Sequence, residues 1–126
     1  MANAITTELA KKKILLARAG EQPLPKITKM AFGTGGVDAD DSVLEVGEKQ
    51  QELNTEVLRK EIDGYEIISD TKVQYQCTLE EEELVGQRLS ELALVDADGD
   101  LVAIKNFTVK EKDGDWKMTF KISDTM

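Results

Sequence analysis

The spacing of apolar residues changes once along the chain. In the N-terminal part, apolar side chains recur at about 100° per residue, which predicts one amphipathic helix over residues 3–19. Asn3 is a suitable cap for its first turn, and Gly20 with the two prolines that follow it ends the helix. Ile14 points away from the expected packing face, which suggests a second contact. That packing face is formed by Ile5, Leu9, Leu16 and Ala19.

In the second half of the chain the period becomes two. Apolar and polar side chains alternate from Val73 to Leu79 and from Trp116 to Ile122, as in strands with one buried face. An apolar run near residues 26–33 predicts an earlier strand, and an acidic loop is expected over residues 34–55. We therefore predict antiparallel strands over residues 57–123.

Three Asp-Gly pairs lie between or beside the predicted strands. This dipeptide favours two-residue hairpin turns, because both central residues of such a turn need positive φ. We therefore predict an α+β fold, in which the N-terminal amphipathic helix packs on a mainly antiparallel β-sheet, or meander. Residues 1–126 are expected to form a single domain. The pairs are Asp63-Gly64, Asp98-Gly99 and Asp113-Gly114.

A glycine-rich segment follows the first predicted strand. Gly33, Gly35 and Gly36 suggest a phosphate-binding loop, but the Gly-Lys-Ser/Thr that completes such a loop does not follow them. No strongly helical segment opens directly behind them either, as a phosphate-binding loop would require. We interpret the segment as a connecting loop.

The charge of the chain limits the classes of partner. A net charge of -9 and an isoelectric point near 4.5 argue against binding to nucleic acids or to anionic membrane surfaces. Residues 1–32 are nevertheless basic, with six Lys/Arg against two Glu. Two interpretations stay open: a docking face, or a basic helix lying on an acidic sheet of the same molecule. The candidates for an interface are Lys11, Lys12, Lys13 and Ile14.

The stretch from Leu92 to Phe107 places three carboxylates at alternate positions around one glycine. An EF-hand loop starting at the first of them would need glycine at its sixth position and glutamate at its twelfth, where this chain has Leu101 and Phe107. The EF-hand interpretation therefore fails. A looser calcium site is the weak alternative to a solvated hairpin turn, and its candidate ligands are Asp96, Asp98 and Asp100.

Catalytic chemistry finds little support in the composition. Without histidine, Ser-His-Asp and Cys-His nucleophiles cannot form, and the usual zinc ligand sets lose their nitrogen donor. We expect no enzyme activity and no cofactor. The one cysteine, Cys77, cannot form an internal disulfide and is expected in the core, and no signal peptide or spanning helix is predicted, so we expect the protein to mature in a reducing cytoplasm.

Two segments resemble a known family. "ITKMAFGTGG" and the later "LSELALVDADGDLVAIKNF" resemble the N-terminal domain of phage tail-collar and tail-fibre proteins, in the same order and over nearly the whole chain. The most specific part is Glu91 to Phe107, and Lys29 to Gly36 is a second anchor. The sequence departs from the family in carrying no fibre repeat after the strand that ends near Ile122.

The resemblance implies a structural protein of a phage or prophage-derived tail, one that attaches a tail fibre or collar to the baseplate. It implies other tail and baseplate proteins as partners, self-assembly into homo-oligomers that are often trimers, and a place in the virion tail after assembly in the bacterial cytoplasm. It supplies no catalytic residues. The alternative, motivated by the acidic turns, is a small acidic module that binds a ligand or calcium without catalysis.

Overall fold

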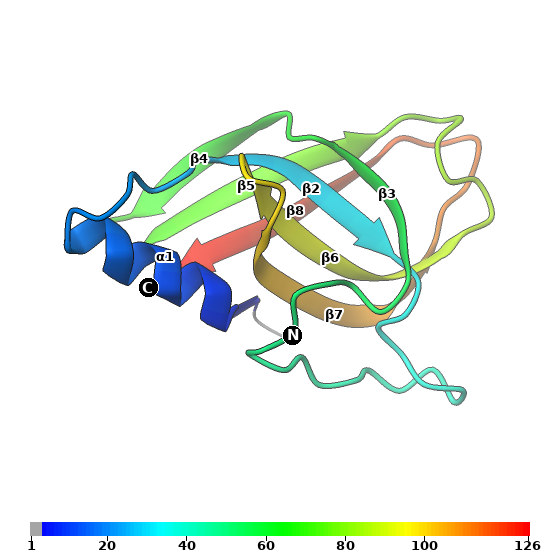
Figure 1. Ribbon diagram of the computed structural model, residues 1–126. Coiled ribbons are helices and arrows are strands. Elements are labelled where there is room, and N and C mark those ends of the chain that lie inside the picture. Colours follow the sequence, from blue (N-terminus) through cyan, green and yellow to red (C-terminus); the bar gives the residue numbers. More distant parts are fainter. Residues whose placement is uncertain (1–3) are drawn as a thin grey trace.

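The computed structural model describes residues 4–126, which form one helix and eight strands in two sheets (Figure 1). One sheet has five strands in the order β1-β7-β6-β2-β3, and the other has three in the order β4-β5-β8. Every neighbouring pair is antiparallel. The elements are β1 (Ile5–Thr6), α1 (Glu8–Arg18), β2 (Ile27–Gly33), β3 (Glu56–Glu61), β4 (Gly64–Ser69), β5 (Lys72–Leu79), β6 (Arg88–Asp96), β7 (Leu101–Glu111) and β8 (Met118–Thr125).

The two sheets pack face to face around one apolar core. The rings of Phe32 and Phe120, one from each sheet, meet edge to face with their centroids 5.3 Å apart. Burying a large apolar side chain of this kind stabilises a fold by about 1.5–3 kcal/mol, so this core is the main source of stability. Its members from the five-stranded sheet include Met30, Phe32, Leu89, Leu92 and Leu94, and those from the three-stranded sheet are Cys77, Leu79, Phe120 and Ile122.

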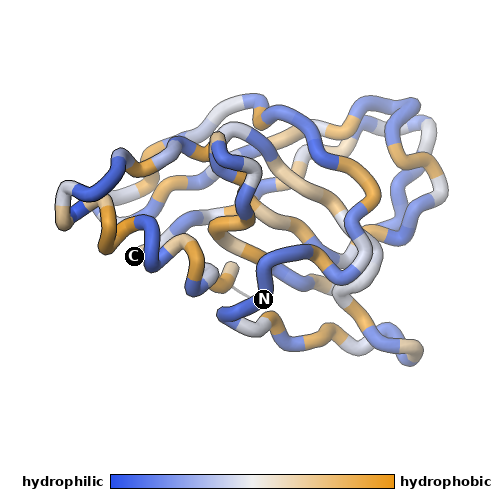
Figure 2. The backbone as a smooth tube through the Cα atoms, in the orientation of Figure 1, coloured by the Kyte–Doolittle hydropathy of each residue, from blue (hydrophilic) through white to orange (hydrophobic). Residues whose placement is uncertain are grey.

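The opposite face of the five-stranded sheet is also covered, by the loop of residues 34–55. Leu53 and Val46 from this loop pack on a second apolar cluster formed by Ala31, Ala93, Val95, Leu101 and Ile104. Strand β6 is therefore enclosed on both faces, and all its residues after Arg88 are buried. Figure 2 shows orange and blue alternating along most of the strands, and orange positions also in the loop of residues 34–55.

The predicted α+β fold class is wrong. Strands account for 48% of the chain and helix for only 9%, so the molecule is a mainly antiparallel β-sandwich with one short helix. The prediction failed because it treated the strands as one surface on which the helix packs. The strands instead form two layers that bury each other, and successive strands pass from one sheet to the other at β3–β4, β5–β6 and β7–β8.

The helix is shorter than the predicted 3–19. Thr7 caps its first turn by accepting a hydrogen bond from the Ala10 amide at 3.1 Å, while the Thr7 hydroxyl donates to the Leu101 carbonyl oxygen at 2.8 Å. Gly20 follows the helix with φ +79°, a conformation that glycine adopts without strain. Asn3, the predicted cap, lies outside the described residues. No helix within residues 4–126 has the length and apolar character needed to cross a membrane.

The three Asp-Gly pairs do not form two-residue hairpins. Asp98 and Gly99 lie in the four-residue connection between β6 and β7, in which only Gly99 has positive φ, at +87°. Asp63-Gly64 carries the chain from one sheet to the other, and Asp113 lies in the β7–β8 connection. Each Asp-Gly pair therefore lies at or beside a connection between two strands, but none forms the predicted two-residue hairpin turn.

Candidate functional site

Lys13 lies among the three aspartates of the β6–β7 turn. Its Nζ donates hydrogen bonds to Oδ2 of Asp96 at 2.6 Å, of Asp100 at 2.7 Å and of Asp98 at 3.1 Å. The lysine side chain is 8% exposed and that of Asp96 only 1%. An interface candidate and the three metal-site candidates thus form one ion cluster within the chain, in which Lys13 and Asp96 are buried while Asp98 and Asp100 are 61% and 43% exposed.

The backbone of the β6–β7 turn places the three carboxylates together. Oδ1 of Asp96 accepts hydrogen bonds from the amides of Asp98 and Asp100, both at 3.0 Å, so the turn is closed by its own first side chain. Helix α1 lies against β7 and presents Lys13 to this turn. The carboxylate oxygens lie within 4.8 Å of one another, close enough to share one cation.

The ammonium group occupies the position that a shared cation would take. Burial by itself would lower the pKa of Lys13, but the hydrogen bonds to Asp100, Asp96 and Asp98 outweigh it and raise the pKa above its usual value. The lysine therefore stays charged and neutralises part of the repulsion between the carboxylates. This geometry favours the interpretation of the aspartates as structural over the calcium alternative.

The other interface candidates lie in different environments. Lys11 is exposed and pairs with Glu48 of the 34–55 loop at 3.2 Å, whereas Lys12 is exposed without an ion pair among residues 4–126. Ile14 is half-buried and lines a small cavity with Leu24 and other residues of this chain. Only part of the candidate set is therefore available to a partner.

Glu91 is a buried carboxylate that sequence reasoning treated only as part of a motif. It accepts hydrogen bonds from the backbone amides of Gly35 at 2.9 Å, Asn54 at 2.8 Å and Thr55 at 2.7 Å. The first amide lies at the start of the long loop and the other two at its end. One carboxylate on β6 therefore closes the loop of residues 34–55. The available signal was a glutamate that interrupts the mainly apolar run from Leu89 to Val95.

Neighbouring side chains complete this closure. Ser90 Oγ accepts a hydrogen bond from the Gly36 amide at 2.8 Å, and Asn106 Nδ2 donates to the Leu44 carbonyl oxygen at 3.0 Å. A β-carbon on Gly36 would overlap the Ser90 carbonyl oxygen, so the glycine allows close approach of two backbones. The two segments that carry the family resemblance thus meet here, with Gly35 and Gly36 from one and Glu91 and Asn106 from the other.

Cys77 points into the core between the two sheets. It is fully buried, and Sγ donates a hydrogen bond to the Glu61 carbonyl oxygen at 3.4 Å. Burial, with a smaller effect of the Asp63 charge, raises the pKa of this thiol to about 11. It is a core residue and not an activated nucleophile.

Strand β4 forms an exposed apolar edge. It pairs with β5 on one side, and the structure of residues 4–126 gives it no neighbour on the other. Tyr65 is 65% exposed, Ile67 70% and Ile68 46%. The register places Tyr65 opposite Tyr75, which itself lies opposite the buried Ile122. Tyr65 and Ile67 therefore lie on the same side of their sheet as the core residues Cys77 and Leu79, but they remain exposed.

A second open region lies between β7 and β8. A groove of about 610 Å³ is lined there by Phe107, Met118 and Phe120. Both bordering strands have free edges within residues 4–126, because β8 pairs only with β5, and β7 meets β1 only at Ala103 and Ile104. Three lysines also line the groove, and none of them forms an ion pair with a described carboxylate: Lys105, Lys110 and Lys121.

The fold and these sites define a class of protein: a small antiparallel β-sandwich whose buried charges hold its own segments and whose strand edges remain free. Within that class, the chain belongs to the family of phage tail-collar fibre proteins, N-terminal domain, whose model matches residues 1–120. This confirms the resemblance noted in the sequence. The protein is therefore a structural component of a phage tail, associated with other tail proteins. No curated protein and no solved structure matched the chain.

Proposed function

We propose that this domain attaches a tail fibre or collar to the baseplate of a phage or prophage-derived tail, as a homo-oligomer and without catalysis. The single observation that carries the proposal, beside family membership, is the exposed edge of β4. An apolar strand with a free edge can pair with a strand of another protein, since its unpaired backbone groups supply hydrogen bonds. Trimeric assembly in the bacterial cytoplasm, before incorporation into the virion, is part of the same proposal.

The exposed face of β4 suits a protein partner. Tyr65 and Ile67 lie next to each other on one side of the strand, and Leu24, 55% exposed, lines the same open region. Large apolar side chains grouped in this way are typical of contact surfaces, because leaving them in water is unfavourable. We propose that a strand of a neighbouring tail protein pairs with β4 and covers them.

The outer face of α1 is a second contact in this proposal. Lys12 is exposed and has no ion pair within residues 4–126, the neighbouring Lys11 pairs with Glu48, and Leu15, one turn further along the helix, is 62% exposed. A basic surface with an exposed leucine suits an acidic neighbour. Lys13 and Ile14 do not take part directly, since both side chains lie against this chain.

A co-purification experiment tests the attachment role. The chain is expressed with the products of neighbouring tail genes, and complexes are isolated through a tag on the chain. Replacing Tyr65 and Ile67 by Ser should lower recovery of the baseplate partner by at least about tenfold, because hot-spot aromatic and aliphatic contacts are lost. The matched control replaces Val85 and Trp116, which are 54% and 67% exposed on other segments, and should leave recovery unchanged.

Two results would contradict the proposal. Wild-type chain that recovers no tail protein would argue against attachment itself. Equal loss of recovery with the control variant would show that the β4 edge has no special part in it.

A further inference from the structure

We propose that the groove between β7 and β8 binds an acidic arm, residues 37–46, of a second copy of this chain. The inference rests on the proposed function, because it assumes that the domain forms a homo-oligomer. It identifies the surfaces through which the copies meet, and it leaves the β4 edge free for other tail proteins.

The groove has the features of a site for a segment that pairs along a strand edge, such as one leg of the bent arm. Its apolar lining comes from Phe107 on β7 and from Met118 and Phe120 on β8, and the bordering strand edges are unpaired. The free part of β7 covers residues 105–111 and could accompany a segment for about 23 Å at 3.3 Å per residue. A segment in this position would cover the half-buried side chains of Phe107 and Met118 and also pair with backbone groups.

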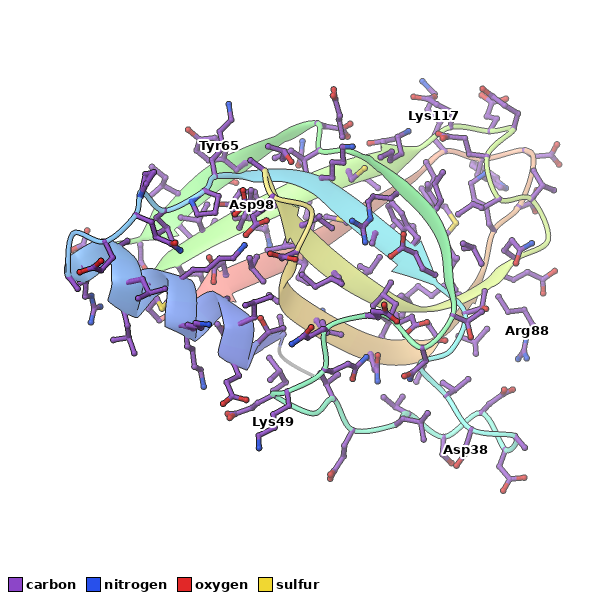
Figure 3. The ribbon with its side chains drawn as sticks, in the orientation of Figure 1. Asp38, Lys49, Tyr65, Arg88, Asp98 and Lys117 are labelled. Carbon is purple, nitrogen blue, oxygen red and sulfur yellow. The ribbon has the colours of Figure 1, made fainter. Side chains whose placement is uncertain are left out.

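The arm is the acidic and apolar counterpart. It carries Asp38, Asp40, Asp41 and Glu45, together with Val43 and Leu44, which are 40% and 38% exposed. Oδ1 of Asp38 accepts hydrogen bonds from the amides of Asp40 and Ser42 at 2.8 and 3.0 Å, which fixes the bend. Figures 1 and 3 show this segment, with Asp38, extending away from the sandwich.

Charge selects this pair of surfaces. Two copies that each carry a net charge of -9 repel each other at long range, so a stable contact needs a place where opposite charges meet. Lys105, Lys110 and Lys121 provide it, because none of them is neutralised within its own described chain. An acidic arm would bring Asp38, Asp40 and Glu45 to these three ammonium groups, whereas its Asp41 already pairs with Arg88 of its own chain at 2.7 Å.

The position of the arm favours exchange between copies. Val43 lines the groove of its own chain, and the Leu44 carbonyl oxygen accepts a hydrogen bond from Asn106 of β7. The arm thus starts beside its own groove and leads away from it. A contact of arm to groove uses two different surfaces, so it joins copies head to tail, and such contacts close into rings, including a ring of three.

Charge reversal on each side tests the inference in the full chain. The groove variant is Lys110→Glu with Lys121→Glu, and the arm variant is Asp40→Lys with Glu45→Lys. Within residues 4–126, none of these four side chains forms a side-chain hydrogen bond or ion pair, so the fold should persist, which circular dichroism checks. Sedimentation should show self-association about 100-fold weaker for each variant. A chain with all four substitutions should regain it.

Matched controls carry the same charge changes elsewhere. Glu81→Lys with Glu82→Lys matches the arm variant, and Lys29→Glu with Lys49→Glu matches the groove variant. All four positions are exposed, and both controls should associate like the wild type. If they weaken association equally, net charge and not the groove controls it, and the inference is overturned.

The remaining outcomes are also decisive. If the wild-type chain associates but the groove and arm variants associate equally well, the arm does not bind there, while the homo-oligomer of the proposed function stands. If the wild type stays monomeric at every concentration, the inference falls, and recovery of tail proteins through β4 remains a separate measurement of attachment.

Discussion

At the scale of single residues, Lys13 shows how a charge can be misassigned from sequence. It lies in a run of three lysines on a helix, where charged side chains are normally solvated, and its partners are more than eighty residues away. The helical period places Lys13 one turn after Ala10 on the same face of the helix, but it could not reveal that the aspartates of the β6–β7 turn lie on that side. For Lys13, the structure supports a basic helix that lies on acidic groups of the same molecule. Lys12 is exposed, so a docking face remains an open interpretation for it.

Replacing Lys13 by Met should destabilise the fold by about 3–5 kcal/mol, because it leaves the buried Asp96 carboxylate and its two neighbours without a counter-charge. Urea denaturation measures this loss. The matched substitution Lys12→Met removes an exposed charge and should change the free energy of unfolding by less than about 0.5 kcal/mol. Equal effects at the two positions would mean that the ion cluster contributes little.

Asp124 gives a prediction for pH. Burial raises the pKa of this β8 carboxyl, so its charged form is less favourable in the folded state than in the unfolded state. Folding is therefore penalised above the folded pKa, and the penalty disappears below the unfolded value of about 3.9. Asp124→Asn should raise the free energy of unfolding at pH 7 and have no effect near pH 3. A gain that persists unchanged at pH 3 would contradict this cause.

At the scale of elements, the 34–55 loop depends on close contact with β6. Gly36→Ala should destabilise the protein by about 1–3 kcal/mol, since the new methyl group would overlap the Ser90 carbonyl oxygen and push the loop from the sheet. Gly47→Ala is the matched control within the same loop, because nothing lies within 4 Å of its added carbon. Thermal unfolding compares the two. A similar loss from both would point to loop flexibility instead of contact.

Local signals in the sequence identified several elements, but not their partners. Gly20 ends the helix with positive φ, which glycine adopts without strain, so the residue type alone reveals this end. The helix start was missed because Ile5–Thr6 pairs with β7, a contact across almost a hundred residues that overrides helical preference. The alternation in β5 and β8 revealed strands with one buried face, yet the same pattern fits one sheet or two. The hydrogen bonds by which Glu91 closes the 34–55 loop could not be predicted either, because its partners are backbone amides far away in the sequence.

At the scale of the whole molecule, the two sheets enclose Cys77, and its reactivity should report global unfolding. The buried thiol has a pKa raised to about 11, so little thiolate exists at pH 7 and no reagent reaches it in the folded state. Modification by a thiol reagent should be slower than in urea by about 1,000-fold or more. Rapid labelling of the native protein would indicate that the two sheets separate locally.

The pairing of β1 with β7 also has a consequence for biosynthesis. Ile5 and Thr6 meet Ile104 and Ala103, and Lys13 meets a turn formed by residues 96–100. During translation, helix α1 therefore leaves the ribosome before residues 96–100 have been synthesised. In that interval Lys13 has no aspartates of this turn to pair with. Residues 5–18 can therefore complete their packing only after β7 has been synthesised, so completion of the fold follows synthesis of that strand.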